Sequence, residues 1–295
     1  MGFSPANLPQ RILVTGGSGA VGSAVACRLA AEHRVVRSIS RHGWSGLPAS
    51  VEQLQVDVAD RAGMGRALEG MDAVVHCSAV GAPDLATCRR TNVDGVAILL
   101  EAMDSARCRR LVHISTVAVY DHRRGTAFDE ESPLWTEPLD AYGFTKAEGE
   151  RLVRAAERSG LAAIILRPVV VLSMHPTSHW GPRALDRARD SAGPLWPLAE
   201  MPFVDVENLV DAILLALTDP RAIGRAYNVV DGTAPTSEYL AAVSAAIGRP
   251  LEHPPPDAPR LVFSGERLRR ELGYSPENRW KKFLEELRGH VEPGR

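Results

Sequence analysis

The 295-residue sequence has few cysteines, few aromatic residues, no excess of charge of one sign and no long apolar run. Its four cysteines form no CxxC pair and no zinc-type spacing, which excludes a zinc finger and disfavours a disulfide framework. We therefore expect reduced, buried thiols in a cytoplasmic protein. Aromatic residues make up only 5% of the chain, which disfavours recognition of single-stranded nucleic acid by stacking.

The charge balance and the apolar runs exclude two further kinds of partner. Lys and Arg number 34 and Asp and Glu 36, a formal net charge of −2, so counterion release cannot drive strong binding to nucleic acid. The longest apolar run, residues 161–172, is interrupted by Arg167 and is too short to span a bilayer. We expect neither a nucleic-acid partner nor a membrane partner, and no metal site is predicted.

The first half of the sequence alternates short β-branched runs with helical stretches. Strands are predicted over 11–15, 34–40, 51–56, 73–77, 110–115 and 162–167, and helices over 21–32, 61–68, 91–105 and 141–159. This alternation predicts an α/β fold with a doubly wound parallel sheet of the Rossmann type. Such sheets bind ligands at the carboxyl ends of their strands.

The second half is less regular and is predicted to supply a small C-terminal substrate-binding region. Residues 175–202 are rich in Pro, Trp and Gly and have no clear period, which predicts a functional loop or lid. A strand followed by a helix is expected over 203–217, a strand over 226–230, and helices over 237–247, 267–272 and 280–289. The predicted domains are a dinucleotide-binding domain over 1–172, with returns at about 203–233, and a smaller domain over 173–202 and 234–295.

A glycine-rich turn, TGGSGAVG, follows the first predicted strand and opens the first predicted helix. Gly16 permits the tight turn, Gly19 lets the backbone approach a pyrophosphate, and Gly22 allows the helix to pack closely on the strand. Ala20 and Val21 begin the helix, whose free N–H groups and positive dipole end favour phosphates. The position of the motif between strand and helix predicts a dinucleotide site.

The end of the second predicted strand indicates which dinucleotide is bound. An NAD site places Asp or Glu there for the ribose 2′-hydroxyl, but this strand ends in Ser40 and Arg41. Arg41 can pair with a 2′-phosphate and Ser40 can donate a hydrogen bond to it, so NADP is favoured over NAD. The alternative is that Arg41 is an ordinary surface residue.

The ends of the next two predicted strands are expected to contribute further cofactor contacts. Asp57 and Val58 end the third strand, where an adenine ring would lie. Asp57 either accepts a hydrogen bond from the adenine amino group or caps the following helix. Ser78 and Ala79 follow the fourth strand and are small enough for close approach of a cofactor, whereas His76 before them is interpreted as a core histidine.

Tyr142 and Lys146 are four residues apart on a predicted helix, which places them on one face. A neighbouring ammonium lowers the pKa of a tyrosine from its usual value of about 10, which would make Tyr142 a general acid or base near neutral pH. Ser115 and Thr116 end the fifth strand, where a hydroxyl can orient a substrate carbonyl toward Tyr142. The alternative for Thr116 is a hydrogen bond to its own backbone neighbourhood.

Together these motifs resemble the extended short-chain dehydrogenases/reductases, also called the NAD-dependent epimerase/dehydratase family. The matching segments are TGGSGAVG (15–22), VVHCSA (74–79), TNVDG (91–95), STVAVY (115–120), YGFTK (142–146), LRP (166–168), FVDVENLVDAI (203–213), AYNVVDG (226–232) and ELGYSP (271–276). The resemblance implies that Thr116 is the catalytic hydroxyl, Tyr142 the proton-transferring tyrosine and Lys146 the ribose-binding lysine.

The resemblance also implies further contacts to the cofactor. It places Asn92 near the cofactor, and it makes Pro168 and the next two residues, Val169 and Val170, line the nicotinamide. The family often pairs two long helices in a homodimer, and the helices predicted to begin at Thr91 and at Ala141 are the ones expected to do so here.

One departure from the family concerns the substrate. Sugar-nucleotide members usually carry Asn shortly after the RP-type motif, whereas residues 169–171 are all Val. Among the apolar residues that follow are Trp180, Trp196 and Phe203, which either line a pocket or lid or belong to the core. These features favour a lipophilic carbonyl substrate over a nucleotide sugar.

The sequence therefore predicts an NADP-dependent ketoreductase or secondary alcohol dehydrogenase that acts on a small-molecule carbonyl or alcohol. One alternative is a nucleotide-sugar epimerase, dehydratase or 4-keto reductase that uses the same three residues. A second is a non-catalytic NADP-sensing protein, against which the intact pair of Tyr142 and Lys146 argues.

Overall fold

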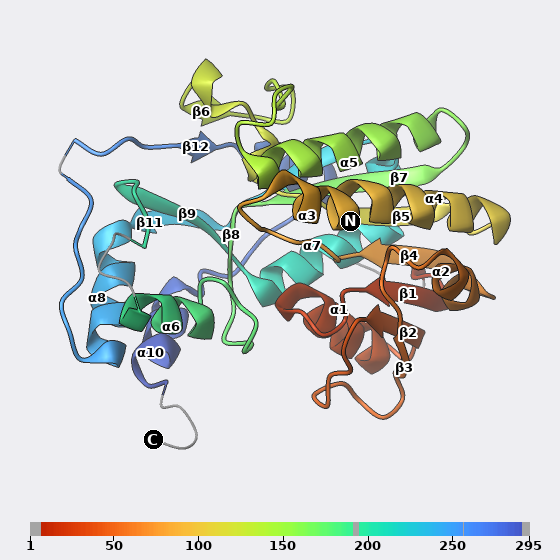
Figure 1. Ribbon diagram of the computed structural model, residues 1–295, viewed down its shortest axis with the longest axis horizontal. Helices are drawn as coiled ribbons and strands as arrows, with labels where there is room; N and C mark the ends of the chain where they lie inside the picture. Colours follow the sequence, from red (N-terminus) through yellow and green to blue (C-terminus); the bar gives the residue numbers. More distant parts are fainter. Residues whose placement is uncertain (1–6, 191–194, 256, 291–295) are drawn as a thin grey trace.

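The computed structural model describes residues 7–190, 195–255 and 257–290. Its larger half is built on a seven-stranded sheet with the order β10-β7-β5-β4-β1-β2-β3 (Figure 1), in which every neighbouring pair of strands is parallel. The strands are β1 (Arg11–Thr15), β2 (Val35–Ser40), β3 (Glu52–Gln55), β4 (Ala73–His76), β5 (Arg110–Ile114), β7 (Ala162–Pro168) and β10 (Ala226–Val229). The predicted Rossmann-type α/β fold is confirmed.

Helices cover both faces of this sheet. On one face lie α1 (Ala20–Ala31) and α7 (Val206–Thr218), and on the other α2 (Arg61–Leu68), α4 (Gly95–Ser105) and α5 (Ala141–Glu157). Successive side chains of a strand point to opposite faces, so Val14 packs with α1 and α7 whereas Leu13 packs with α2 and α4. Because both faces are buried, the central strands are apolar without alternation.

The strand order reverses at β1, which pairs with both β2 and β4. Ligands of such sheets bind in the crevice at the carboxyl ends of the strands, at the point of reversal. Two predicted cofactor segments meet there, because the glycine-rich turn follows Thr15 and the small residues follow His76. The backbone N–H of Cys77 donates to the carbonyl oxygen of Thr15 at 3.3 Å, which joins the two segments.

The smaller half contains a three-stranded sheet in the order β11-β9-β8. Its elements are β8 (Val170–Leu172), β9 (Glu200–Asp205), β11 (Gly232–Pro235), α6 (Pro182–Asp190), α8 (Thr236–Ile247) and α10 (Trp280–Arg288). They share one apolar core and lie together at the side of the molecule away from α2 and α4 (Figure 1). The predicted domain limits divide these strands between two domains, whereas the core groups them in one.

Short elements complete the chain. They are α3 (Leu85–Arg89), the π-helical turn η2 (Arg90–Asp94), the turns η3 (Val117–Val119), η4 (His122–Arg124) and η5 (Pro220–Ala222), α9 (Glu266–Leu272), and the paired strands β6 (Ala127–Phe128) and β12 (Val262–Phe263). No helix in the described ranges is long and apolar enough to cross a membrane.

One prediction of local structure is wrong, and one helix differs in its bounds. The loop predicted over 175–202 contains α6, and residues 191–194 of it lie outside the described ranges. Its helical pattern is weak because only a narrow stripe that includes Ala184, Leu185 and Ala188 is buried, among charged residues. The helix predicted over 91–105 begins earlier, at Leu85, and runs without a break from α3 through the π turn η2 into α4. The pairing of α4 and α5 in a homodimer stays a prediction.

Candidate active site

The glycine-rich turn forms a cradle at the start of α1. Gly16 has a φ of +73°, and a Cβ built on it would lie 3.0 Å from the backbone of Cys77 and Ser78. A Cβ on Gly22 would clash with the carbonyl oxygen of Gly16. Gly19 is the N-cap residue of α1 and has no side chain that could accept from the first N–H groups of the helix. The first turn of α1 contains no acidic residue. The first N–H groups of α1, beginning at Ala20 and Val21, are thus suited to bind phosphate oxygens.

The end of β2 lies against this cradle and carries no carboxylate. The N–H of Gly16 donates to the carbonyl oxygen of Ile39 at 2.8 Å, which holds the turn on β2. The hydroxyl of Ser40 donates to the carbonyl oxygen of His42. Arg41 is exposed, and its guanidinium makes no hydrogen bond or ion pair to any residue that the structure describes.

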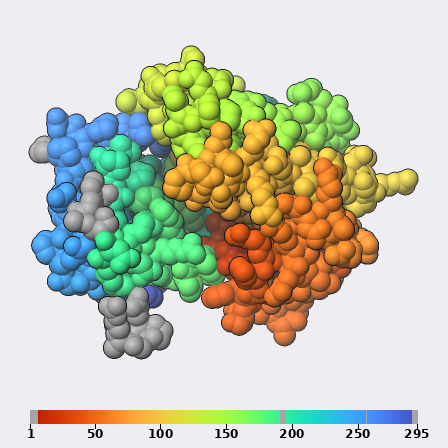
Figure 2. All heavy atoms as spheres, in the orientation of Figure 1, coloured from red at the N-terminus to blue at the C-terminus, as the bar shows by residue number. Residues whose placement is uncertain are grey.

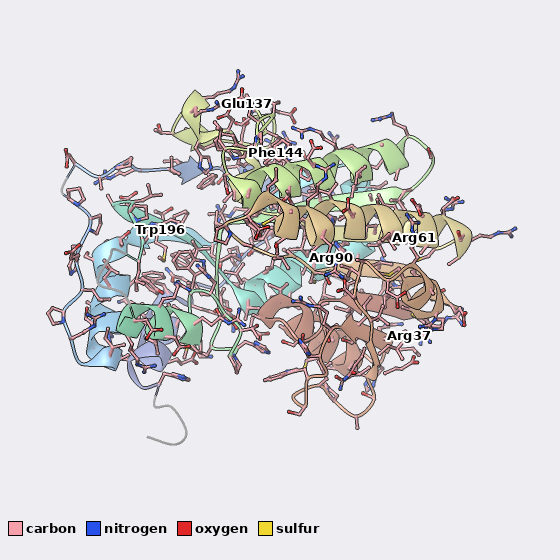
Figure 3. All side chains as sticks on the ribbon, in the orientation of Figure 1. Arg37, Arg61, Arg90, Glu137, Phe144 and Trp196 are labelled. Carbon is pink, nitrogen blue, oxygen red and sulfur yellow. The ribbon has the colours of Figure 1, made fainter. Side chains whose placement is uncertain are left out.

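Asp57 follows β3 and is held by protein groups. One carboxylate oxygen accepts from the N–H of Ala59 at 2.9 Å, and the other lies 3.1 Å from Nη2 of Arg90. Arg90 lies at the side of α3 and α4 that faces β1 and β2 (Figure 3). The residue that caps α2 is Asp60, so the capping alternative for Asp57 is wrong, while Val58 beside it is buried.

His76, interpreted from the sequence as a core histidine, is fully buried before Ser78 and the exposed Ala79. Its Nδ1 lies 2.8 Å from Oγ1 of Thr15, and its ring stacks on that of His113 with the centroids 5.3 Å apart. Burial lowers the pKa of His76 to about 3 and the pKa of His113 well below its usual value. Both imidazoles are therefore neutral at physiological pH.

Asn92 lies in the π turn η2 and fixes the segment after β4. Its side chain accepts from the N–H of Val80 at 2.9 Å and donates to the carbonyl oxygen of Val80 at 2.9 Å. It also donates to Oγ1 of Thr145 at 3.1 Å. Asn92 thus ties the segment that begins with Ser78 to α5, directly beside Lys146.

Thr116, Tyr142 and Lys146 come together at the carboxyl end of β5. Asp140 caps α5 by accepting from the N–H of Tyr142 at 3.1 Å, and the Thr116 hydroxyl lies near enough to the Tyr142 phenol to lower its pKa. The ammonium of Lys146 donates to the carbonyl oxygen of Ile114 at 2.7 Å. Thr116 also makes the hydrogen bond to its own backbone neighbourhood that was the alternative interpretation, because its Oγ1 accepts from the N–H of Ala118 at 3.2 Å.

The expectation that Lys146 lowers the pKa of Tyr142 is wrong for this structure. Burial and the charge of Asp140 raise the pKa of Tyr142 to about 12, against a smaller lowering by the Thr116 hydroxyl. Burial lowers the pKa of Lys146 to about 8, opposed by the charge of Glu150. The ammonium is directed to Ile114 rather than to the phenol, so Tyr142 is held protonated and ready to donate.

The groups around this edge fit a nicotinamide dinucleotide. Ser115 presents a buried hydroxyl that has no partner among the described residues. Pro168, Val169 and Val170 are buried at the end of β7 and supply an apolar wall. The space-filling view shows a hollow between the gold residues of α3 and η2 and the green residues after β8 (Figure 2).

The aromatic residues after β8 pack into the smaller half. The rings of Trp180 and Trp196 meet edge to face with centroids 4.9 Å apart, and Phe203 stacks on Trp280 at 4.8 Å. Phe203 is fully packed in the core, while both tryptophans are partly buried against it. Trp196 lies in the half of the molecule away from Arg90 (Figure 3).

Three features of the site were not identified from the sequence. Asp140 has a recognisable signal, an Asp directly before a helix, which is a strong N-cap preference. The pairing of His76 with His113 depends on the register of β4 and β5, which no local pattern reveals. Glu150 could have been recognised because it follows Lys146 by one helical turn and therefore shares its helix face.

The fold and the site together define an NAD(P)-dependent enzyme of the short-chain dehydrogenase/reductase type. The chain belongs to the NAD dependent epimerase/dehydratase family, whose model matches residues 12–230.

Among known proteins, the chain is 30% identical to a dTDP-6-deoxy-L-talose 4-dehydrogenase (NAD(P)(+)) of Kitasatospora kifunensis, over 96% of each chain. It is also 30% identical to a 4-hydroxy-2-methyl-3-oxo-4-farnesyl-3,4-dihydroquinoline-1-oxide ketoreductase of Stigmatella aurantiaca, over 61% of this chain and 55% of that protein. A short-chain dehydrogenase/reductase superfamily protein of Agrobacterium tumefaciens, solved with bound NAD, superposes with a TM-score of 0.78 at 29% identity, covering 94% of this chain and 96% of that one.

Proposed function

We propose that the protein is an NADP-dependent ketoreductase for a lipophilic carbonyl compound, or in reverse a secondary alcohol dehydrogenase. The observation that carries the proposal is the meeting of one protonated phenol, Tyr142, with the hydroxyl of Thr116 at an edge of the sheet bordered by apolar residues. The wall formed by Val169 and Val170 offers no hydrogen-bonding side chain to a sugar or nucleotide. An apolar wall beside two convergent polar groups suits an apolar substrate with one reactive oxygen.

Bound NADPH would supply the hydride to the carbonyl carbon. Thr116 donates a hydrogen bond to the carbonyl oxygen and orients it, and Tyr142 transfers its phenolic proton to the same oxygen as negative charge develops there. Lys146 binds the ribose through the N–H donors that its hydrogen bond to Ile114 leaves available. The buried hydroxyl of Ser115, which has no partner among the described residues, can bond to the cofactor.

Two features favour NADP within this proposal. The end of β2 has no carboxylate to accept from a ribose 2′-hydroxyl, and the exposed guanidinium of Arg41 is available to a 2′-phosphate. Asp57 is engaged by Arg90, which favours a positioning role over recognition of adenine.

The site offers little support for a dehydratase. Loss of water needs a further base and acid beside the substrate. Val117 and Ala118, which follow Thr116, carry neither an acid nor a base, and the carboxylate that acts on Tyr142, Asp140, is engaged in capping α5. The second candidate is a nucleotide-sugar 4-keto reductase. It is favoured by the match to the Kitasatospora kifunensis dehydrogenase over almost the whole chain and uses the same hydride and proton transfer.

Oxidation of NADPH should be followed side by side with alkyl β-keto esters, aryl alkyl ketones and a dTDP-4-keto-6-deoxy sugar. We expect kcat/KM to be at least about tenfold higher for a lipophilic ketone, with turnover reduced by about 10³ in Tyr142→Phe. Tyr227→Phe, whose hydroxyl bonds Glu271 in the larger half, is the matched control and should keep its activity. Turnover of the dTDP sugar alone, together with thermal stabilisation by TDP, would establish the second candidate instead.

A further inference from the structure

A buried ion pair joins α5 to β7 behind the catalytic residues. Arg167 of β7 donates to both carboxylate oxygens of Glu150, with Nη2 to Oε2 at 2.6 Å and Nε to Oε1 at 2.9 Å. Their side chains are only 5% and 2% exposed. Two parallel, charge-assisted hydrogen bonds fix both position and orientation of the partners. Glu150 follows Lys146 by one turn of α5, so the pair reaches the catalytic face of the helix.

The same guanidinium reaches the segment that follows Thr116. Nη1 of Arg167 donates to the hydroxyl of Tyr120 at 3.0 Å, and the guanidinium carbon lies 5.1 Å from the centroid of the Tyr120 ring. The Tyr120 hydroxyl donates in turn to Oδ1 of Asn228 in β10 at 2.6 Å. Arg167 therefore ties together the strand β7, the helix that carries Tyr142 and Lys146, and the chain just after Thr116.

The other groups that face Lys146 are neutral. They are His76 at the end of β4, Cys77 directly after it, and His113 in the neighbouring strand β5. Burial raises the pKa of Cys77 to about 12 and lowers the pKa of both histidines below neutrality. On α5 itself, burial keeps the Tyr142 phenol protonated. Glu150 is thus the charged group that raises the pKa of Lys146 against the effect of burial.

We propose that Glu150, held by Arg167, is a positioning residue for the reaction: it supplies the counter-charge that keeps the buried Lys146 ammonium protonated and fixes α5 against β7. Arg167 acts through Glu150 and also aligns the segment after Thr116 by way of Tyr120. The proposal rests on the roles that the proposed function gives to Tyr142 and Lys146, and it applies to any carbonyl or alcohol substrate that they serve.

Substitution of Glu150 should change the pH at which Lys146 loses its proton. Glu150→Gln keeps the size of the side chain but removes the counter-charge and leaves the Arg167 cation buried without an ion-pair partner. The loss of rate at alkaline pH should then begin at least one pH unit lower than in the native enzyme, with kcat reduced at least about tenfold at pH 8. Glu150→Asp keeps the charge, so its pH profile should stay close to that of the native enzyme.

A double variant separates the electrostatic role from a purely structural one. In Glu150→Gln with Arg167→Gln, both charges of the ion pair are gone, so no guanidinium is left buried without its carboxylate. We expect its Tm to return to within a few degrees of the native value while the alkaline loss of rate still begins at lower pH. Glu148→Gln, on the same helix and paired with Arg151, is the matched control and should leave the pH profile unchanged.

Cofactor affinity gives a readout that does not depend on turnover. The Kd of NADPH and of NADH, titrated by fluorescence between pH 6 and pH 10, should rise at lower pH in Glu150→Gln than in the native protein, because deprotonation removes the positive charge of Lys146 and one of its three N–H donors. If no ketone is reduced but this shift is present, the proposed function fails and the role of Glu150 stands. Superposable pH profiles for the native protein and a folded Glu150→Gln or double variant would overturn the role of Glu150.

Discussion

The ammonium of Lys146 and the carbonyl oxygen of Ile114 lie 2.7 Å apart. This hydrogen bond ties α5 to the end of β5, so the helix that carries the proton donor is held against the strand that carries Thr116. It also explains why Lys146 does not act on Tyr142 by direct contact. In this protein the lysine is oriented first by the backbone, and its remaining N–H donors are available to the ribose.

The protonation of Lys146 predicts an alkaline limit for reduction. Burial lowers the pKa of Lys146 from its usual value of 10.5 to about 8, so the ammonium form of the folded protein is lost as the pH rises through about 8. We expect kcat/KM to be constant below about pH 7 and to fall about tenfold per pH unit well above pH 8. Lys146→Arg should abolish the fall of kcat/KM at alkaline pH, because a guanidinium stays charged, although its overall rate should be lower. A native profile that stays flat to pH 10 would contradict the assignment.

Arg41 is predicted to select NADP. Its guanidinium is exposed and free of protein partners within the described ranges, so Arg41→Ala removes an interaction with a 2′-phosphate and little else. A charge-assisted hydrogen bond contributes about 1.5–3 kcal/mol, so the Kd of NADPH should rise by about 10- to 100-fold. The Kd of NADH, measured in the same fluorescence titration, should be unchanged and serves as the control. An equal loss for both cofactors would show that Arg41 does not read the phosphate.

The stacked histidines predict a loss of stability in acid. A histidine that stays neutral when folded takes up its proton only in the unfolded chain, below about pH 6.5, so stability falls as the pH decreases, by about 1.4 kcal/mol per pH unit for each such group. Both ring nitrogens of His113 are buried without partners among the described residues, so His113→Phe removes no hydrogen bond. We expect the variant to match the native protein within about 1 kcal/mol at pH 8.

Lowering the pH from 8 to 5 should destabilise the native protein more than His113→Phe. The difference between their free energies of unfolding should change by about 2 kcal/mol in favour of the variant. Urea unfolding at the two pH values measures this directly. The ring of phenylalanine can keep the stack on His76, which the histidine makes at a centroid distance of 5.3 Å. Identical slopes of stability against pH in both proteins would mean that His113 is protonated in the folded state.

The catalytic residues were predictable because each depends on local geometry. Tyr142 and Lys146 share a helix face by their spacing alone, and Thr116 lies at the end of an apolar strand whose place in the sheet follows from the alternation of elements. Gly16 and Gly22 mark their turn because only glycine fits there. None of these inferences requires knowledge of which strands are neighbours.

The features that the sequence could not supply depend on register or on distant packing. His76 and His113 are directly opposed only because β4 and β5 pair in one register. Arg167 interrupts an apolar run, and its partner Glu150 comes from a helix that packs on β7 only in the folded chain. The pKa of Tyr142 depends on burial, which outweighs the spacing of Lys146 that the sequence displays.

The glycine cradle gives a last prediction with a control inside the same chain. A Cβ on Gly22 would clash with the carbonyl oxygen of Gly16, and backbone atoms cannot move aside without opening the turn that faces the phosphates. Gly22→Ala should therefore weaken the binding of NADPH and NADH alike, by at least about 10-fold, and lower the Tm. Gly65→Ala in α2 has open space around its Cβ and replaces glycine inside a helix, so it should stabilise the protein by about 0.5–1 kcal/mol and leave both Kd values unchanged. Full cofactor affinity in Gly22→Ala would mean that the dinucleotide binds elsewhere than at this turn.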